Sequence, residues 1–333
     1  MNDIFIIAEI SANHNNDINT AYKTIDAIAD SGADCVKVQT YTADSLTMNV
    51  DNEYFGPKKD GPWKGKTLHE LYTEGSMPYE WQPKLKKYTE DRGLIFFSSP
   101  FDENAVDFLE DMDTPMYKIA SPEINDIPLI EYAASKGKPM IISTGMANLS
   151  DIELAVNACR KVGNNDITLL KCTSECPATP EMANLLTIPN LKETFNVKVG
   201  LSDHTMGSTI PIAAVALGAT VIEKHFILDR NQGGPDALFS MEPHEFKDMV
   251  EASRNAYKAL GEIKYELTER NRNRRCSLFI AEDVKAGEII TEKNVKSVRP
   301  GFGLPPVYLS DILGKEVNRD LKKGTPMKFE FLG

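Results

Sequence analysis

The amino-acid sequence predicts an α/β protein, a (β/α)8 TIM barrel followed by a small β-rich domain. Short runs of β-branched and other apolar residues alternate about eight times with amphipathic helical patterns, which is typical of a parallel sheet buried on both faces. Eight repeats in roughly 260 residues suit a closed barrel better than an open sheet. After Gly261 the alternation weakens and the composition changes, which indicates a second domain.

The expected strands and helices follow one another along the first part of the chain. An amphipathic pattern near residues 21–29 and an apolar one near 209–217 predict helices. Ser150-Asp-Ile-Glu153 has the spacing of a capping box, and Thr179-Pro180 places an N-cap residue before a proline. No Gly-x-Gly-x-x-Gly turn follows a strand, which counts against a dinucleotide-binding fold. The strands are expected at residues 4–10, 35–40, 94–98, 116–119, 139–143, 167–171, 197–201 and 221–225.

Residues 41–77 interrupt this rhythm after the second expected strand. The segment is more than thirty residues long and contains Asp60-Gly-Pro-Trp63 and several lysines. Connections of this length usually carry function or are mobile. At the carboxyl ends of the barrel strands it would lie over the site as a lid.

The domain boundaries are expected at residues 1–261 for the barrel, 262–275 for a linker and 276–333 for the second domain. The polar and highly charged residues 265–275 predict a linker or a solvated helix end. Short β-type runs at 277–280, 288–290 and 326–331 predict strands in the tail. A domain of about 55 residues is near the size at which a core of its own is marginal, so we expect it to dock on another surface.

Composition restricts the class of partner. Apolar residues make up 41% and charged residues 26% of the chain, as in ordinary globular proteins. The net charge of −12 argues against nucleic acid and against an anionic membrane surface. There is no apolar run of about 20 residues and no signal-peptide pattern, so we expect a cytoplasmic protein. The five cysteines show no disulfide or zinc-site spacing.

Two of the five histidines, His204 and His225, fall at the ends of neighbouring expected strands. In a parallel barrel the carboxyl ends of the strands carry the chemistry. Two imidazoles there can converge on one divalent metal and leave positions for water or a substrate oxygen. Alternatively, one histidine caps the loop after Asp203 and the other packs within its strand.

Polar side chains end nearly every expected strand. For a lone serine, a cap or a satisfied polar group of the barrel is the better explanation. Buried lysines and carboxylates, however, are costly unless they are paired or used. Three lysines with several hydroxyls predict a cradle for phosphate and carboxylate groups, with Glu9 as general base or water-positioning group. These strand-end residues are Glu9, Lys37, Gln39, Ser98, Ser99, Lys118, Ser121, Glu123, Ser143, Lys171, Thr173, Ser174, Ser202, Asp203 and Glu223.

Seven short motifs at the strand ends are specific when taken together. In order they are Ala8-Glu-Ile-Ser-Ala-Asn-His14, Lys37-Val-Gln39, Ser98-Ser-Pro100, Tyr117-Lys-Ile-Ala-Ser121, Ser143-Thr-Gly145, Gly200-Leu-Ser-Asp-His204 and Glu223-Lys-His-Phe226. With them the chain resembles, from end to end, the sialic acid synthase (nonulosonic acid synthase) family of phosphoenolpyruvate-condensing enzymes. Its tail is similar to that family's antifreeze-like SAF domain, with Val298-Arg-Pro-Gly301 as the marker.

Within the family the chain resembles the pseudaminic acid synthase branch. The shared segments are Tyr41-Thr-Ala-Asp-Ser-Leu-Thr47, residues 68–81 ending in Pro-Tyr-Glu-Trp, and Lys296-Ser-Val-Arg-Pro-Gly-Phe-Gly-Leu304. The resemblance implies condensation of phosphoenolpyruvate with 2,4-diacetamido-2,4,6-trideoxy-altropyranose and water, giving pseudaminic acid and phosphate.

The resemblance also assigns roles to the strand-end residues. It implies that Glu9 is catalytic and that His204 and His225 hold a divalent metal, Mn²⁺ with Mg²⁺ or Co²⁺ as alternatives. It implies a homodimer in which each SAF domain caps the partner's barrel and Arg299 reaches the partner's sugar. The implied phosphoenolpyruvate-binding residues are Lys37, Ser99, Lys118, Ser121, Ser143, Ser174 and Ser202, and the implied sugar-binding residues are Gln39, Glu123, Glu223, Asp236 and Arg299.

Two departures from the family pattern concern the sugar. Cys176 stands where a sugar-contacting tyrosine is common, and Arg275 or Cys276 stands where the sialic acid synthases have an aromatic residue. Gly234-Pro-Asp-Ala237 is more similar to the sialic and legionaminic enzymes, so a synthase that uses a manno-configured sugar is the alternative.

Two other classes are weighed against a synthase. One is a Schiff-base aldolase that uses Lys118 or Lys171 with pyruvate. The other is a non-enzymatic sugar- or ice-binding protein built around the tail. The density of ionisable residues at the strand ends counts against the second class.

Overall fold

The computed structural model describes residues 4–59, 64–174 and 178–333. The chain divides into two compact units, Met1–Gly261 and Glu262–Gly333, and each is described by itself. Asp60–Trp63 and Cys176, which entered the expectations about the lid and the sugar, lie outside the described residues. None of the helices in the described part of the chain combines the length and the apolar character that crossing a membrane requires.

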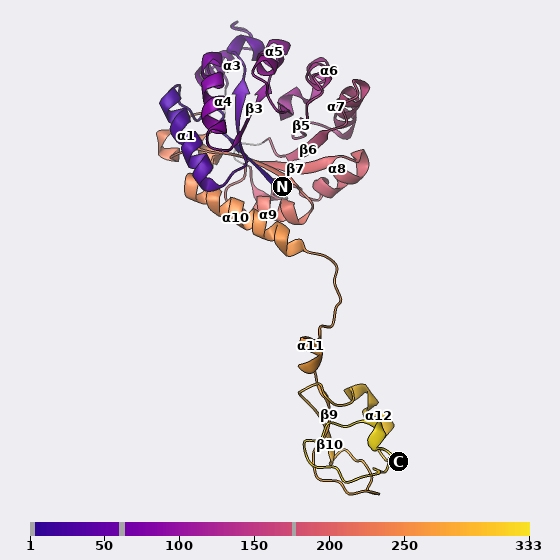
Figure 1. The fold of residues 1–333 in the computed structure, drawn as a ribbon. Coiled ribbons are helices and arrows are strands. Elements are labelled where there is room, and N and C mark those ends of the chain that lie inside the picture. Colours follow the sequence, from indigo (N-terminus) through magenta and orange to yellow (C-terminus); the bar gives the residue numbers. More distant parts are fainter. Residues whose placement is uncertain (1–3, 60–63, 175–177) are drawn as a thin grey trace. The chain divides into compact units, whose positions relative to one another are not determined.

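The first unit is a closed barrel of eight parallel strands in sequential order, which confirms the expected fold class (Figure 1). Each strand lies within two residues of its expected range at either end. The strands are β1 Phe5–Glu9, β2 Cys35–Thr40, β3 Ile95–Pro100, β4 Tyr117–Ile119, β5 Met140–Ser143, β6 Ile167–Cys172, β7 Lys198–Asp203 and β8 Val221–His225.

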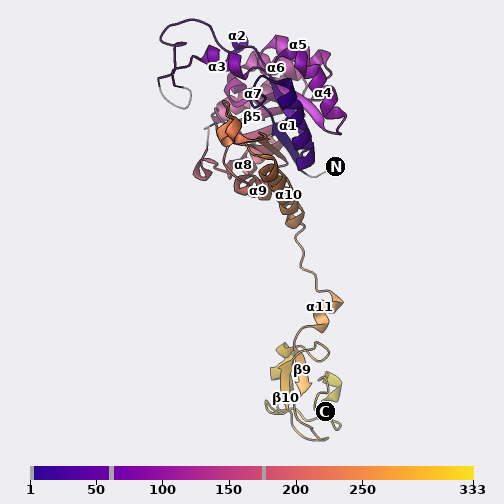
Figure 2. The ribbon, with the colours of Figure 1, turned by 90° about the vertical axis from the view of Figure 1, so that its left-hand side faces the viewer.

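Helices surround the barrel on its outside, as Figures 1 and 2 show. The main hydrophobic core lies between strands and helices, where Ile6, Val38 and Ile142 pack with Ile25, Leu85 and Val156. The helices of this layer are α1 Ile18–Ser31, α4 Gln82–Glu90, α5 Glu103–Asp111, α6 Ile127–Ser135, α7 Leu149–Lys161, α8 Thr187–Phe195, α9 Thr209–Ala216 and α10 Pro243–Leu260.

The expected start of α7 was wrong by two residues. The helix is capped by Asn148, whose side chain accepts from the backbone N–H groups of Ser150 and Asp151. The Asp151 carboxylate accepts from the backbone N–H of Asn148 in return. This closes a capping box in which asparagine replaces serine, because either side chain can accept from an N–H two or three residues later.

The expected helix start at Thr179-Pro180 is a single 3₁₀ turn, Pro180–Met182, in which Thr179 makes no side-chain cap. The α-helix of this repeat begins only at Thr187. A proline after a threonine fits the first position of a 3₁₀ turn as well as that of an α-helix, since both need a fixed φ and no N–H.

The interior of the barrel is built in two layers. The lower layer is apolar and contains Ile7, Cys35, Phe97, Ile141, Leu170 and Val221, packed with Phe5 and Met116. Side chains two residues apart on a strand point to the same side. The residues two positions further along these strands therefore form a second interior layer towards the carboxyl ends, and we call it the polar layer. It contains Glu9, Lys37, Ser99, Lys118, Ser143, Cys172, Ser202 and Glu223.

The long connection after β2 contains two short helices, α2 Ala43–Leu46 and α3 Leu68–Gly75. Thr67 caps α3 through a capping box with Glu70. Tyr41 and Tyr72 meet edge to face, with ring centroids 5.9 Å apart. This contact joins the start of the insertion to α3.

The second unit has a hydrophobic core of its own, formed by residues such as Leu278, Ile290 and Val317. The first expected strand is correct: β9 Ser277–Ile280 pairs antiparallel with β10 Val295–Val298. The strand β10 was missed, because its side chains alternate only weakly in polarity. The other two expected strands are wrong. Residues 288–290 make one isolated bridge, and residues 326–331 make another and end in a 3₁₀ turn at Phe329–Phe331.

Two further short helices, α11 Glu269–Asn273 and α12 Leu309–Ile312, belong to this unit. α11 falls within the charged stretch expected to be a linker or a solvated helix end. Thr268 caps it, and its residues are exposed or only half-buried.

Candidate active site

Four ionisable side chains of the polar layer form one buried network. Lys37 Nζ lies 2.7 Å from Glu9 Oε2 and 3.2 Å from Glu223 Oε2. Lys118 Nζ donates to Glu223 Oε1 at 2.8 Å, and Ser202 Oγ donates to the same oxygen at 2.9 Å. Each of the four groups is at most 4% exposed. Strand register explains the arrangement, because Glu9 pairs with Lys37 on one side and with His225 on the other.

Burial and pairing set the charge states in this network. Burial opposes ionisation of Glu223, but Lys118 and Lys37 outweigh it and hold the pKa of Glu223 well below its usual value. Burial lowers the pKa of Lys37 to about 7, although Glu223 acts in the opposite direction. The network is therefore close to balanced in charge, and an arriving anion has to compete with Glu223 for both lysines.

The hydroxyl groups of Ser121 and Ser174 converge around Gly145. The Gly145 backbone N–H donates to Ser121 Oγ at 3.1 Å. A Cβ placed on Gly145 would lie 2.2 Å from Ser174 Oγ and 2.9 Å from Ser121 Oγ. Glycine is required at this position because any side chain would fill the space between the two hydroxyls. Nearby in the polar layer, the buried Ser143 hydroxyl has no hydrogen-bond partner within the described part of the chain.

His204 and His225 lie side by side, with ring centroids 5.2 Å apart. His204 Nδ1 is 3.1 Å from the carbonyl oxygen of Thr173, so this nitrogen donates, and in the neutral ring Nε2 then keeps a lone pair for a metal. Burial lowers the pKa of His225, and its Nδ1 has no hydrogen-bond partner in the described chain. Phe239 packs edge to face on both rings, with centroids 5.6 and 4.9 Å away.

This pair fits a divalent metal through its donor chemistry. Imidazoles with free lone pairs are the form in which histidine binds metals, and the contact of His204 with a carbonyl is the usual way to orient such a ligand. Asp236 Oδ2 lies 3.9 Å from His225 Nδ1. Within residues 4–59, 64–174 and 178–333, no group of three or more His, Cys, Asp or Glu is placed to hold a metal. The protein would thus supply two imidazoles and leave the other positions to water and substrate.

A cavity of about 240 Å³ opens beside the two histidines. Its polar side contains Gln39 and Asp236, next to His204 and His225. Much of the remaining lining is apolar or aromatic and comes from the insertion after β2, which also contributes Lys58. The other residues of the lining are Ser11, Ala12, Tyr41, Leu68, Leu71, Tyr72, Gly75, Pro235 and Phe239.

Most of the residues singled out from the sequence meet here. Eleven lie in the polar layer, among the hydroxyls around Gly145, or in the cavity beside the two histidines: Glu9, Lys37, Gln39, Ser99, Lys118, Ser121, Ser143, Ser174, Ser202, Glu223 and Asp236. Glu123 follows β4, and burial raises its pKa to about 7. Arg299 belongs to the second unit, directly after β10.

Three strand residues singled out from the sequence, Ser98, Lys171 and Asp203, do not face the interior of the barrel. Ser98 alternates with Phe97 and Ser99, and its hydroxyl donates to the Val38 carbonyl at 3.0 Å. Lys171 alternates with Cys172, so it points away from the polar layer, and its Nζ donates to the Cys172 carbonyl at 2.7 Å. The cradle therefore has two lysines and not three. Asp203 alternates with Ser202 and His204 and binds Lys224 outside the barrel interior.

Sequence reasoning missed two features of the site. Cys172 occupies the β6 position of the polar layer, and its Sγ lies 3.9 Å from His204 Nδ1. Cys172 lies two residues after the interior residue Leu170, so the alternation of side chains along β6 would have identified it. The apolar wall formed by Leu68, Leu71 and Tyr72 was missed because helix α3 reads only as a short amphipathic segment inside a long loop.

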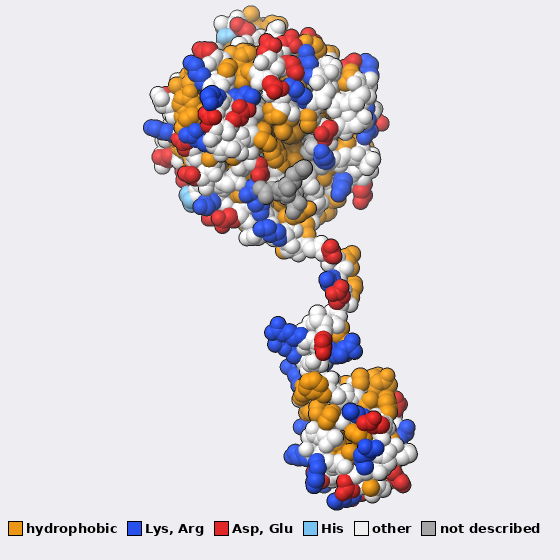
Figure 3. Space-filling model, viewed as in Figure 1, with side chains coloured by type: hydrophobic (Ala, Val, Ile, Leu, Met, Phe, Trp, Pro, Cys, Tyr) orange, Lys and Arg blue, Asp and Glu red, His pale blue; other side chains and the backbone are white. Residues whose placement is uncertain are grey.

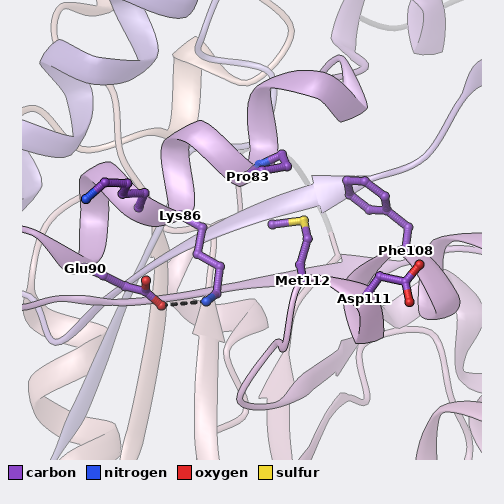
Figure 4. Close-up of a pocket in the computed structure, with 7 residues that line it drawn as sticks. Pro83, Lys86, Glu90, Phe108, Asp111 and Met112 are labelled. Atoms are coloured by element: carbon purple, nitrogen blue, oxygen red, sulfur yellow. Dashed lines mark ion pairs between the residues drawn. The ribbon is translucent and has the colours of Figure 1, made fainter.

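One groove on the outside of the barrel is unrelated to these residues. It has a volume of about 500 Å³ and lies between α4 and α5, lined by Pro83, Phe108 and Met112 with charged side chains at its rim (Figure 4). The drawn ion pair joins Lys86 and Glu90 at 2.8 Å. Nothing in this groove resembles the buried ionisable cluster inside the barrel.

The fold and the polar layer define a (β/α)8-barrel enzyme. Residues 24–265 match the NeuB family, and residues 275–332 match the SAF domain. The chain therefore belongs to the NeuB family and carries a SAF domain, which confirms the family resemblance of its motifs.

Relatives extend this similarity over nearly the whole chain. The chain is 46% identical over 326 residues to a pseudaminic acid synthase of Helicobacter pylori, covering 97% of this chain and 96% of the relative. It is 39% identical over 335 residues to an N,N'-diacetyllegionaminic acid synthase of Campylobacter jejuni, covering 97% and 98%. The crystal structure of a sialic acid synthetase from Leptospira borgpetersenii has a TM-score of 0.73 at 34% identity and covers 81% of this chain and 90% of that one.

Proposed function

We propose that this chain is a pseudaminic acid synthase. It condenses phosphoenolpyruvate with 2,4-diacetamido-2,4,6-trideoxy-altropyranose and water to give pseudaminic acid and phosphate. The observation that carries the proposal is the 46% identity to a pseudaminic acid synthase over nearly the full length of both chains. The buried cluster of two lysines, two carboxylates and several hydroxyls supports the reaction class.

Phosphoenolpyruvate is a compact anion, and the polar layer offers groups that suit it. Lys37 and Lys118 supply the positive charge, and the hydroxyls around Gly145 supply donors for phosphate oxygens. Binding replaces the contacts that both lysines make with Glu223. The remaining hydroxyls proposed for this role are Ser99, Ser143 and Ser202.

The chemical step forms a bond between C3 of phosphoenolpyruvate and the aldehyde carbon of the open-chain sugar. Water adds at C2, and phosphate leaves. Glu9 holds that water and takes its proton, since Glu9 is a buried carboxylate within the polar layer. A divalent ion held by His204 and His225, Mn²⁺ with Mg²⁺ or Co²⁺ as alternatives, would polarise the aldehyde when bound.

The sugar lies in the cavity beside the histidines. Gln39, Glu123, Glu223 and Asp236 are the polar groups proposed to contact it. The apolar side made by Leu68, Leu71 and Tyr72 suits the methyl groups of a diacetamido 6-deoxy sugar. Gly234-Pro-Asp-Ala237, which resembles the sialic and legionaminic enzymes, contributes Pro235 and Asp236 to the same cavity. A manno-configured sugar therefore stays the alternative substrate.

We also propose that the protein is a cytoplasmic homodimer in which each SAF domain caps the partner's barrel and brings Arg299 to the partner's sugar. Loops after β5, β7 and β8 expose apolar side chains, among them Met146, Met206 and Leu238. Figure 3 shows hydrophobic side chains gathered near the middle of one face of the barrel unit. The SAF domain exposes apolar residues too, Phe302 and Val307, and both kinds of surface suit a partner.

Phosphate release from phosphoenolpyruvate and the altro sugar tests the reaction class. We expect no release after exhaustive chelation and recovery when Mn²⁺ is added. Replacement of His204 or His225 by alanine should remove Mn²⁺ binding. Full turnover without metal would contradict the metal assignment. Trapping of a covalent pyruvate adduct by borohydride on Lys118, with activity insensitive to chelators, would instead indicate a Schiff-base aldolase.

A further inference from the structure

A buried ion pair joins β7 and β8 on the outer face of the barrel sheet, next to the two histidines in sequence. Lys224 on β8 is 0% exposed, and Asp203 on β7 is 3% exposed. The two residues are register partners in the parallel β7–β8 pair. Lys224 Nζ donates to Asp203 Oδ2 and to the carbonyl oxygen of Thr205, each at 2.5 Å.

The placement of these contacts along the chain links both histidines. Asp203 and Thr205 flank His204 on either side, and Lys224 directly precedes His225. A single ammonium group on the strand that carries His225 therefore binds the side chain before His204, that of Asp203, and the backbone carbonyl after it, that of Thr205. Asp203 adds to this by accepting from the Thr205 N–H at 3.0 Å and from the Thr205 hydroxyl at 2.9 Å.

Stability alone does not account for a charged pair at this position. Replacing a buried ion pair by apolar side chains of similar volume is often neutral or even stabilising. The neighbouring residues of this layer are ordinary core residues such as Ile222 and Phe226.

We infer that Lys224 and Asp203 are positioning residues that fix the separation and orientation of the His204 and His225 imidazoles. The inference rests on the proposed function, because it takes these histidines as the metal ligands. Neither Lys224 nor Asp203 faces the barrel interior, so they act on the geometry of the metal site through the backbone of the two strand ends. Groups that orient ligands in this way typically change metal affinity by about 10- to 100-fold.

The test is the affinity of the full-length protein for Mn²⁺, measured by the electron paramagnetic resonance signal of free Mn²⁺. The variant Lys224→Met with Asp203→Asn removes both charges and leaves an amide oxygen to accept from Thr205. We expect its Kd for Mn²⁺ to rise at least about 10-fold. Its melting temperature in chelator should stay close to that of the parent. Lys138→Met is the control, since Lys138 pairs with Glu110 on the outside of the barrel and should leave the Kd unchanged.

Lys224→Arg provides a second variant that keeps the positive charge. A guanidinium is larger and planar and cannot reproduce the contacts of an ammonium, so it too should weaken Mn²⁺ binding. An unchanged Kd, within twofold, in either variant that melts like the parent would overturn the inference. If the parent itself binds no Mn²⁺, the proposed metal site fails instead, and the two failures are thereby distinguished.

Discussion

Glu9 is the residue on which the proposed chemistry depends most. Its carboxylate is buried, and Lys37 is its ion-pair partner at 2.7 Å. Glu9→Gln keeps the shape but removes the charge and the basicity. We expect kcat to fall by roughly 10²- to 10⁴-fold with little change in the KM for phosphoenolpyruvate. Steady-state phosphate release measures both constants. Glu90→Gln, an exposed carboxylate on α4, is the matched control, and a kcat for Glu9→Gln within a few-fold of the parent would make Glu9 structural.

Glu123 makes the stability of the protein depend on pH. Burial raises its pKa from 4.5 to about 7, and its Oε2 has no partner in the described chain. Between these two values the unfolded state ionises first, so the folded state binds more protons there. Stability therefore falls as pH rises through this window. At pH 8, Glu123→Gln should raise the melting temperature by roughly 2–4 °C, and at pH 4 it should change nothing. An equal shift at both pH values would show that burial of the ionised form is not the cause.

At the scale of elements, the insertion after β2 forms one wall of the cavity. Leu68 begins α3 and lines that wall. Leu68→Asn keeps the approximate size and adds a polar group, which favours a hydroxyl over a methyl. We expect the ratio of kcat/KM for the 6-deoxy altro sugar over N-acetylmannosamine to fall by about 10-fold. Leu260→Asn, at the exposed end of α10, should leave the ratio as it is. If both variants behave alike, the wall does not select the sugar.

Elements with a strong local pattern were the ones that sequence predicted well. All eight barrel strands were expected, because β-branched runs such as the one at β1 recur between helical patterns. The start of α7 was misplaced because serine and asparagine cap helices equally well, and the choice depends on where the preceding loop ends. The tail was predicted less well, since most of its pairs are isolated bridges such as Val284–Leu321 and have no alternating pattern.

The candidate site was predicted at its polar centre and not at its boundary. The residues at strand ends could be found because the carboxyl ends of parallel strands always meet on one face. Whether Lys171 or Cys172 faces the interior depends on where β6 begins, and one residue reverses the answer. The wall made by Leu71 and Tyr72 comes from a distant loop whose approach to the barrel is set by tertiary packing.

At the scale of the whole molecule, the proposed dimer makes each site depend on two chains. Chains carrying Arg299→Ala are to be mixed with chains carrying Glu9→Gln under conditions that exchange subunits. A mixed dimer has one site with both residues intact if Arg299 acts on the partner. At random exchange about a quarter of the parent activity should return. If each variant alone is inactive, mixed dimers that form and recover no activity would show that Arg299 does not act on the partner's site.

The identity of the sugar tests the central claim most directly. Phosphate release with phosphoenolpyruvate is to be measured against three sugars: 2,4-diacetamido-2,4,6-trideoxy-altropyranose, the corresponding manno diacetamido sugar and N-acetylmannosamine. A site with an apolar wall loses little binding free energy when the sugar carries a 6-methyl group. A site built to bind the 6-hydroxyl would be left with unpaired polar groups by the 6-deoxy sugar. We expect the highest kcat/KM for the altro sugar and at most weak turnover of N-acetylmannosamine. A higher kcat/KM for either manno sugar would contradict the assignment as a pseudaminic acid synthase.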